Sequence, residues 1–374
     1  MKLFITGGAG FIGKWLVRSL PMDTEVVIVD SLDEQVHKTQ VEFAEELRKR
    51  AVCIKADIRD QNAYAQALEG TDVVVHLAAQ TGTGQSMYEI SKYIQHNVDG
   101  TAKLLEVING LTQKPRRIVL TSSRAVYGEG AFVDGSTIKY GRGRRLEDLQ
   151  AGKWEIYNEN GQELHPLPMK EDHLTNPTSI YGLTKLWQEQ LIENYADNQK
   201  IDYVIFRLQN VYGPEQELHN PYTGIIGIFT SLIMQKGEVE LFEDGKVTRD
   251  FVYVRDVAEA LIKGMYYEGC LSKVINVGSG KATSLEQLVN TIAAVSGRIL
   301  TIKYSGRFRV GDVRHALADM DQYKSIFTEW NPTSLEEGIS SYLKWYLEQE
   351  PLSDSTLSAS FKEMEDKNLL LESK

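Results

Sequence analysis

The first thirteen residues, Met1-Lys-Leu-Phe-Ile-Thr-Gly-Gly-Ala-Gly-Phe-Ile-Gly13, decide which fold to expect. Leu3–Thr6 has the length and β-branched character of a buried strand, and an apolar helical pattern follows the glycines. Between strand and helix, Gly7 permits a tight turn, Gly10 lets the backbone approach a pyrophosphate, and Gly13 allows close packing of the helix on the sheet. The helix N-terminus then supplies amide donors to phosphate. The segment therefore predicts a dinucleotide-binding βαβ unit.

Short apolar runs and helical patterns continue to alternate through about residue 210. The further expected strands are Glu25–Asp30, Val52–Ala56, Val73–Ala78, Arg117–Ser122 and Tyr203–Arg207. The expected helices among them include Phe11–Leu20, Gln40–Arg50 and Gly100–Gly110. Such alternation requires right-handed crossovers and a parallel sheet that is covered on both faces. The sequence thus predicts an α/β protein with a doubly wound parallel Rossmann sheet.

The domain organisation follows from where this alternation stops. We expect residues 1–207 plus about 247–268 to form the dinucleotide-binding domain, with a long insertion at 129–176. Residues 208–246 plus 269–350 are expected to form a smaller, interleaved C-terminal α/β lobe for the substrate, and 351–374 a polar tail, frayed or loosely helical. Long loops inside a compact domain are usually functional. Because the insertion links the strand before it to the helix after it, we expect it to border the substrate pocket; the alternative is a surface insertion without a role.

Composition and charge exclude several classes of protein. The 374 residues are 42% hydrophobic and 25% charged, as in ordinary globular proteins. The net charge of −11 repels nucleic acid and anionic membranes, so we expect neither as a partner. The two cysteines cannot build a disulfide framework or a Cys-rich zinc site, and we expect no metal. The chain shows neither a signal-peptide pattern nor an apolar run of membrane-spanning length, which predicts a soluble cytoplasmic protein.

Carboxylates end two of the expected strands. Asp30 ends the second strand, where a carboxylate binds the adenosine ribose hydroxyls and repels the 2′-phosphate of NADP. The expected cofactor is therefore NAD. Asp57 ends the third strand, near the expected position of adenine, and a helix N-cap is an equally open interpretation.

The fourth strand ends in small residues, where bulk would block a dinucleotide. His76 within it is expected to be a packed core histidine rather than a catalytic one. Asn97 begins a helix, where it would either brace the active-site backbone or serve as a simple cap or helix-surface residue.

The residues with the clearest catalytic pattern follow. Ser122 and Ser123 lie at the carboxyl end of the fifth strand, the edge at which open α/β sheets bind ligands. Tyr181 and Lys185 stand four residues apart and share one face of a helix. A nearby ammonium and a cationic nicotinamide should both lower the pKa of the phenol. Together these groups can move a proton on or off an alcohol while a hydride moves to or from a cofactor.

These motifs resemble one known family over about residues 1–348. The resemblance is carried by Thr6–Gly13, Ala56-Asp57, His76–Ala79, Ser122-Ser123 with Val126–Gly128, Tyr181–Lys185, Arg207–Pro214 and Arg249–Val254. The chain is similar to extended short-chain dehydrogenases/reductases of the NAD-dependent nucleotide-sugar epimerase/dehydratase family. This resemblance implies a nucleoside-diphosphate sugar substrate and a homodimer built from the helices near Ser91–Gly110 and Tyr181–Asn198.

The resemblance also implies roles for individual residues. Ser123, Tyr181 and Lys185 would be catalytic, with Ser123 also binding substrate. Asn210, Arg249 and Arg309 would bind the diphosphate, although a surface ion pair is the alternative for either arginine. The cofactor-binding candidates are Gly7, Gly10, Phe11, Ile12, Gly13, Asp30, Asp57, Ile58, Leu77, Ala78, Ala79, Asn97, Tyr181 and Lys185.

Within the family, the insertion and the runs Gln209–Pro214, Asn220–Gly224 and Val310–His315 look most similar to the branch of dTDP-L-rhamnose 4-epimerases. The expected activity is NAD-dependent 4-epimerisation through a 4-keto sugar. A 4,6-dehydratase or decarboxylase is the alternative, but the resembling dehydratases carry an Asp-Glu pair, and decarboxylases a Glu, where Arg124 and Ala125 stand here. A non-catalytic NAD-binding regulator is the third possibility; such proteins typically lose the tyrosine or the lysine.

Overall fold

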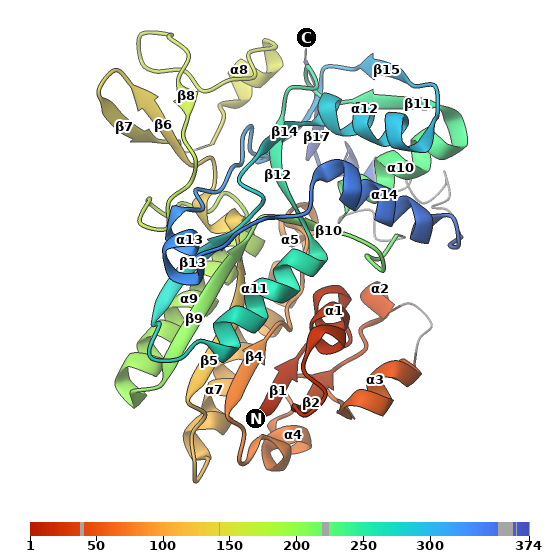
Figure 1. The fold of residues 1–374 in the computed structure, drawn as a ribbon. Helices are drawn as coiled ribbons and strands as arrows, with labels where there is room; N and C mark the ends of the chain where they lie inside the picture. Colours follow the sequence, from red (N-terminus) through yellow and green to blue (C-terminus); the bar gives the residue numbers. More distant parts are fainter. Residues whose placement is uncertain (38–40, 142, 219–223, 351–361, 364, 374) are drawn as a thin grey trace.

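The computed structural model describes residues 1–37, 41–141, 143–218, 224–350, 362–363 and 365–373. Its centre is a seven-stranded sheet in the order β13-β9-β5-β4-β1-β2-β3, in which every neighbouring pair is parallel (Figure 1). The strands are β1 (Lys2–Thr6), β2 (Glu25–Asp30), β3 (Val52–Lys55), β4 (Val73–His76), β5 (Arg117–Ser123), β9 (Asp202–Leu208) and β13 (Lys273–Val277). The expected doubly wound α/β fold is confirmed.

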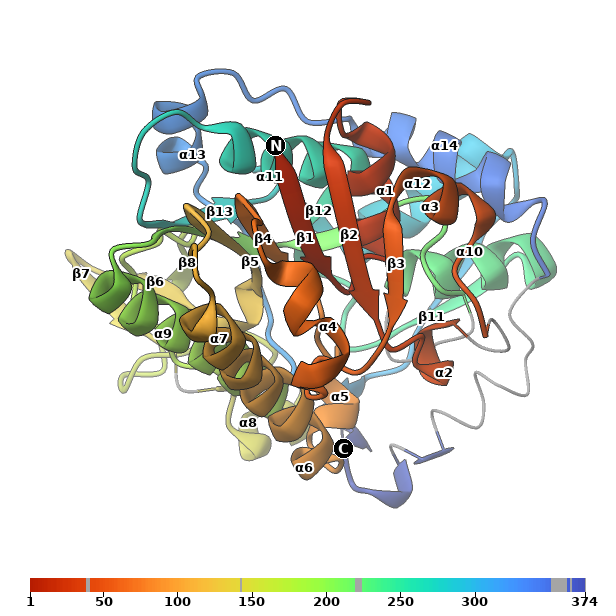
Figure 2. The same cartoon turned by 90° about the horizontal axis from the view of Figure 1, so that it is seen from below.

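Alternate residues of the central strands pack into two hydrophobic cores, one on each face of the sheet. Val73 and Val75 pack with one set of helices, whereas Val74 between them packs with the other. Figure 2 shows the two layers. The first layer contains α1 (Phe11–Ser19), α3 (Glu45–Arg50), α11 (Val254–Tyr266) and α13 (Asp321–Phe327). The second contains α4 (Gln61–Leu68), α7 (Gly100–Gly110) and α9 (Ile180–Gln199).

The register of the sheet brings the predicted site residues to one edge. Thr6 pairs with Val29 on one side and with His76 on the other, so β1, β2 and β4 end at the same level. The strand order reverses direction between β1 and β4, which is where open α/β sheets bind their ligands. Short elements border this edge: α2 (Glu34–His37), α5 (Thr83–Ser86), α6 (Ile90–Tyr93), a π-helix (Ile94–Asp99) and a 3₁₀ helix (Arg124–Tyr127).

A second lobe stands above this edge and has its own hydrophobic core (Figure 1). Its elements are β10 (Asn210–Tyr212), α10 (Ile225–Lys236), β11 (Glu238–Leu241), β12 (Thr248–Tyr253), β14 (Ala282–Ser284), α12 (Leu285–Ser296), β15 (Thr301–Tyr304), β16 (Arg307–Arg309), α14 (Leu335–Tyr346) and β17 (Leu370–Glu372). Capping boxes begin two of the helices, because Ser284 pairs with Gln287 before α12 and Ser334 with Glu337 before α14.

Two strand assignments from the sequence are wrong. β13 was expected in the smaller lobe, but it pairs with β9 and extends the central sheet. β12 was expected in the dinucleotide-binding domain, but it pairs with β10 and β14 in a separate three-stranded sheet, while α11 directly after it returns to the central sheet. Apolar patterning locates a buried strand, but it does not say which neighbour the strand pairs with.

The insertion at 129–176 contains more regular structure than a loop. A three-stranded antiparallel sheet in the order β7-β6-β8 and one short helix stand to one side of the lobe (Figure 1). They are β6 (Ala131–Asp134), β7 (Thr137–Tyr140), α8 (Leu146–Gln150) and β8 (His165–Pro166). Strands this short carry too little pattern to stand out among glycines.

The remaining expectations concern the start of α3, two segments outside the described part of the chain, and the C-terminal tail. α3 begins only at Glu45, so the helix expected from Gln40 is shorter. Residues 220–223 and 351–361 lie outside the described part of the chain. In the rest of the tail, β17 pairs antiparallel with β16. Among the described residues, no helix has both the length and the apolar character needed to cross a bilayer.

A close backbone contact at the end of β1 generates a prediction. Gly7 has a φ of +70°, and a Cβ there would lie 2.6 Å from the backbone nitrogen of Ala78. Gly70 has a φ of +69° with nothing within 4 Å. Gly70→Ala should therefore lower the free energy of unfolding by about 1–2 kcal/mol through backbone strain alone. Gly7→Ala should lower it by about 3 kcal/mol or more. Urea titrations of both variants test this, and equal losses would contradict the steric argument.

Candidate active site

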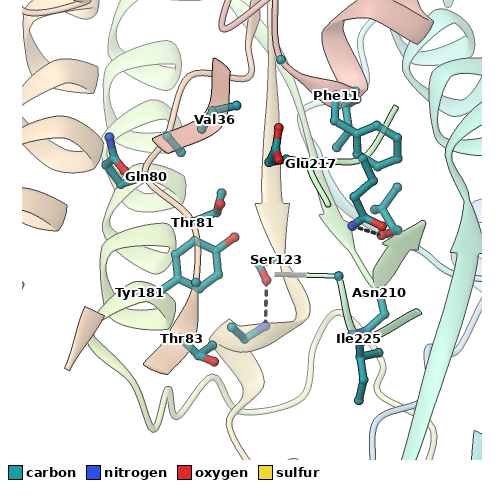
Figure 3. A pocket seen from close by; sticks show the side chains of 18 of the residues that line it. Phe11, Val36, Gln80, Thr81, Thr83, Ser123, Tyr181, Asn210, Glu217 and Ile225 are labelled. Atoms are coloured by element: carbon teal, nitrogen blue, oxygen red, sulfur yellow. Dashed lines mark hydrogen bonds between the residues drawn. The ribbon is translucent and has the colours of Figure 1, made fainter. Parts of the chain in front are cut away.

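A cavity of about 830 Å³ extends from the glycine-rich turn, past Ser123 and Tyr181, into the smaller lobe. All residues that the sequence named as cofactor-binding, substrate-binding or catalytic line this cavity, with the exception of Asn97 and Lys185. Figure 3 shows Ser123 between Tyr181 on one wall and Asn210 on the other. One cavity thus joins the two halves of the predicted site.

The glycine-rich end of the cavity fits the pyrophosphate and ribose of a dinucleotide. Gly7 lies against the Ala78 backbone, and Gly13 lies so close to Gly8 that a Cβ would come within 2.6 Å of its Cα, so a side chain at either position would clash with the protein backbone. Asp30 accepts hydrogen bonds from the backbone N–H of Ala9 at 3.0 Å and of Leu32 at 2.9 Å. These two donors fix the carboxylate at the cavity wall with further lone pairs available for ribose hydroxyls.

Asp57 is held by an ion pair rather than by a helix end. Its carboxylate accepts from the Arg59 guanidinium at 2.6 and 2.8 Å, and this contact lowers the pKa of Asp57. The residue at the N-cap of α4 is Asp60, so the alternative of Asp57 as an N-cap is wrong. Asp57 lines the cavity beside Ile58.

A segment across the cavity mouth was missed by the sequence analysis. Asp33, Val36 and His37, in and beside α2, line the cavity. The segment is fastened to the elements after β4, because Gln80 donates to Asp33 at 3.2 Å and Gln35 pairs with Gln85 at 2.6 Å. Each contact joins residues about fifty positions apart in the sequence, so no local pattern predicts it.

His76 is a packed core histidine, as expected. Its ring is fully buried and contacts Thr6 Oγ1 at 2.7 Å and Thr101 Oγ1 at 2.9 Å. Burial, aided by the charge of Lys185, lowers the pKa of His76 to about 3, so the ring stays neutral. Thr6 in turn accepts from the Ala78 backbone N–H at 3.2 Å, which ties the histidine to the cavity wall.

Asn97 is a bracing residue and not part of the cavity wall, which corrects its assignment as a cofactor contact. The side chain is completely buried. Its amide oxygen accepts from the Gln80 backbone N–H at 2.7 Å, and its nitrogen donates to the Gln80 carbonyl at 3.1 Å and to Thr184 Oγ1 at 3.0 Å. Asn97 therefore locks the strand end after Ala79 to the helix that carries Tyr181.

Lys185 also lies behind the wall. Its ammonium donates to Gln188 Oε1 at 2.6 Å, and Gln188 donates onward to Thr101 at 2.7 Å. Burial lowers the pKa of Lys185 to about 7, against the opposing charge of Glu189. The charge on this ammonium is therefore sensitive to pH near neutrality.

The two serines at the end of β5 have different surroundings. Ser122 is buried and donates to Glu189, which forms an ion pair with Arg207 at 2.8 Å. Ser123 caps the 3₁₀ helix by accepting from the Ala125 backbone N–H at 3.1 Å, as Figure 3 shows. Because Ser123 accepts from the protein, its hydroxyl proton can point to a ligand oxygen in the cavity.

Tyr181 does not show the low pKa expected from the sequence. Burial raises the pKa of its phenol, and a hydrogen bond with Ser123 opposes this only in part. The Lys185 ammonium is directed to Gln188, so it does not favour the phenolate here. Lowering the pKa of Tyr181 therefore requires the positive charge that an oxidised nicotinamide brings to the cavity.

The two arginines expected to bind the diphosphate differ in how many hydrogen bonds their guanidiniums already make to the protein. Arg249 donates to Asp312 at 3.0 Å and to the Val313 carbonyl at 2.9 Å, so much of its bonding capacity holds the segment after β16. Arg309 lies with its guanidinium 5.4 Å from the centre of the Phe242 ring, and its enclosed Nε has no partner among the described residues. An unpaired guanidinium in a cavity wall fits an anionic ligand.

The insertion does not border the cavity, which corrects that expectation for its described residues. It supports the wall from behind through buried ion pairs. Arg144 pairs with Glu243 at 2.8 Å, and Glu155 pairs with Arg314 at 2.7 Å. Glu243 itself lines the cavity, so the insertion contacts the site indirectly, through Glu243.

The wall of the smaller lobe was not readable from the sequence. Ile228, Leu232, Phe242, Val247 and Leu285 supply an apolar surface beyond the arginines. They come from α10, α12 and the segments around β11, where their spacing is that of ordinary core residues. An apolar surface next to guanidiniums suits a nucleoside attached to a diphosphate.

Comparisons with known proteins agree with this geometry. The NAD dependent epimerase/dehydratase family matches residues 3–278. The dTDP-L-rhamnose 4-epimerase of Burkholderia thailandensis is 39% identical over 355 residues, which cover 93% of this chain and 95% of that protein. Among solved structures, a UDP-N-acetylglucosamine 4-epimerase from Methanobrevibacter ruminantium, in complex with UDP-N-acetylmuramic acid, has a TM-score of 0.75 at 29% identity, covering 93% of this chain and 99% of that chain.

A second solved structure contains the cofactor. The UDP-glucuronic acid 4-epimerase of Bacillus cereus, in complex with UDP-glucuronic acid and NAD, has a TM-score of 0.75 at 25% identity and covers 93% of this chain and 99% of its own. Fold and site thus define an enzyme that uses NAD. The chain belongs to the NAD dependent epimerase/dehydratase family, and the resemblance to the dTDP-L-rhamnose 4-epimerase branch is confirmed.

The position of Asp30 generates a prediction about cofactor choice. Asp30→Asn should weaken NAD binding about 10–100-fold, the loss expected for charge-assisted hydrogen bonds. It should also reduce the preference for NAD over NADP, because the carboxylate charge that repels the 2′-phosphate is removed. Calorimetric titration of nucleotide-free protein measures both affinities, with the exposed Asp23→Asn as control. An unchanged ratio of the two affinities would remove Asp30 from the ribose site.

Proposed function

We propose that this protein is a nucleotide-sugar 4-epimerase whose substrate is a nucleoside-diphosphate sugar. The observation that carries the proposal is that Ser123 and Tyr181 lie together in the cavity, while neither residue directly after Ser123 is a carboxylate or a histidine. The two residues after Ser123 are Arg124 and Ala125. A guanidinium stays protonated at neutral pH, and alanine does not ionise.

The residues of the chain divide the chemistry between them. NAD, when bound, supplies a reversible acceptor for the hydride at C4. Tyr181 takes the C4 hydroxyl proton and returns it, and Ser123 holds the C4 oxygen throughout. The charges of Arg249 and Arg309 orient the ligand through its diphosphate. Because neither Arg124 nor Ala125 can remove a proton from C5, the 4-keto sugar rotates in the site and receives the hydride on its opposite face.

A cofactor that stays bound between turnovers is consistent with this reaction. An epimerase makes no net redox change, so its cofactor is recycled within each turnover. The segment around α2 closes over the ribose end of the cavity and is fastened by Gln35 and Gln85. We propose that this fastening keeps NAD bound between turnovers.

We also propose a homodimer, a cytoplasmic location and a role in carbohydrate biosynthesis. The π-helix and α7 lie beside α9 (Figure 2), as the dimer of the resembling family requires. Apolar side chains are exposed on the elements leading into this surface, at Met87, Ile90 and Ile94. A second copy of the chain would cover them.

The proposed proton transfer predicts the effect of removing the phenol oxygen. Tyr181→Phe should lower kcat about 10²–10⁴-fold, the range for a general acid–base group, with NAD still bound. The matched control is Tyr304→Phe, since Tyr304 is half exposed and does not line the cavity. Turnover of dTDP-L-rhamnose, followed by product NMR, gives the rates. Full activity of Tyr181→Phe would exclude the phenol as the proton acceptor.

The absence of an acid and base next to Ser123 predicts the isotope content of the product. Turnover in heavy water without added NAD should give a 4-epimer that carries no carbon-bound deuterium, because the same hydride returns to C4. dTDP-L-rhamnose is the first substrate to test and UDP-glucose the second. A 4,6-dehydratase would introduce solvent deuterium at C5, a decarboxylase would release carbon dioxide, and a regulator would turn over neither substrate. Deuterium on the sugar skeleton would overturn the proposal.

A further inference from the structure

Arg124 occupies a place in the cavity that the proposed mechanism does not use. It begins the 3₁₀ helix directly after Ser123, so the two Cα atoms are about 3.8 Å apart. Its side chain lines the cavity. A cation thus stands beside the group that would hold the reacting sugar carbon.

The guanidinium of Arg124 has almost no partner in the protein. Its one hydrogen bond runs from Nη2 to the Gly128 carbonyl at 2.7 Å. The Nε atom is enclosed and has no partner among the described residues, and in that part of the chain no carboxylate lies within ion-pair distance of Arg124. By contrast, Arg249 pairs with Asp312 and Arg144 pairs with Glu243. The carboxylates of Glu129 and Asp312 act on the charge of Arg124 only from beyond ion-pair distance, so this enclosed cation has room for an anionic ligand as a direct partner.

Its surroundings indicate which part of a ligand it would meet. Burial and the like charge of Arg249 lower the pKa of Arg124 to about 10, so the side chain remains a cation at neutral pH. Arg124 shares the cavity with Ser123, its chain neighbour at the expected sugar end, and with Arg249 and Asp312 at the expected diphosphate end, whose charges act on it. The part of a nucleotide-sugar that joins these two ends is the phosphate attached to the sugar.

We propose that Arg124 binds the sugar-linked phosphate of the substrate and so sets the depth at which the sugar enters the site. The proposal rests on the proposed function, because it assumes a nucleoside-diphosphate sugar. A phosphate oxygen is the favoured partner over a sugar hydroxyl, since charge-assisted bonds to an anion are about twice as strong as bonds between neutral groups. A planar guanidinium also suits phosphate oxygens geometrically.

Nucleotides that differ by this one phosphate test the contact without turnover. Calorimetry on the NAD-bound protein compares TDP with TMP, and UDP with UMP, for the wild type, Arg124→Gln and Arg124→Lys. Arg124→Gln should weaken TDP binding about 10–100-fold and change TMP binding by no more than about twofold. Arg124→Lys keeps the charge and should retain part of the preference for TDP. Arg145→Gln, at an arginine whose side chain is 74% exposed, is the control and should change neither affinity.

The ratio of the two affinities is measured within each variant, so a partly unfolded preparation does not distort it. Unchanged TDP binding by Arg124→Gln would overturn the proposal, as would equal losses for TDP and TMP. A loss confined to the intact sugar nucleotide would assign Arg124 to the sugar and would also overturn it. A wild-type protein that binds neither TDP nor UDP would instead contradict the proposed function, which separates the two failures.

Discussion

The backbone contact between the Gly7 turn and the Ala78 strand end is the constraint on which the rest of the site depends. At this switch point, β1 and β4 end at the same level, and the chain leaves them in opposite directions. Only a residue without a Cβ can stand there, because any side chain would meet the Ala78 backbone. Gly7 and Ala78 also line the end of the cavity that fits a pyrophosphate.

A buried polar chain connects this contact to the catalytic helix. Thr6 accepts from Ala78 and meets His76, and His76 lies against Thr101 and Gln188. Gln188 then accepts from Lys185, which places the ammonium. Each of these groups has its hydrogen-bond partner in the interior, so the chain fixes one geometry without an unpaired polar atom among the named side chains. Burial lowers the pKa of Lys185 in this position, so a bound ligand can change the protonation of its ammonium group.

The diphosphate half of the cavity is organised by charge. Ion pairs from the insertion hold Arg314 and Glu243, and a further pair holds Arg249 against Asp312. Arg124, Arg144 and Arg309 each have an enclosed Nε without a hydrogen-bond partner among the described residues. Arg144 forms ion pairs with Glu129 and Glu243, whereas in that part of the chain Arg124 and Arg309 form none. The net charge of −11 keeps anions away from the protein in general, so binding of a dianion depends on such local cations.

The sequence by itself determined the fold class, the turn with its glycines, Asp30 at its strand end, and the serine, tyrosine and lysine. Each of these signals is local: a strand end, a turn or one helical face carries it within a few residues. The family resemblance added Asn210, Arg249 and Arg309. Only the tertiary structure decided that Asn97 and Lys185 stand behind the cavity wall, that β13 joins the central sheet, and that the insertion supports the site from outside. It also decided the raised pKa of Tyr181 and the enclosed Nε of Arg124, which has no partner among the described residues. These properties depend on burial and on partners far away in the chain, and no local pattern of residues encodes either.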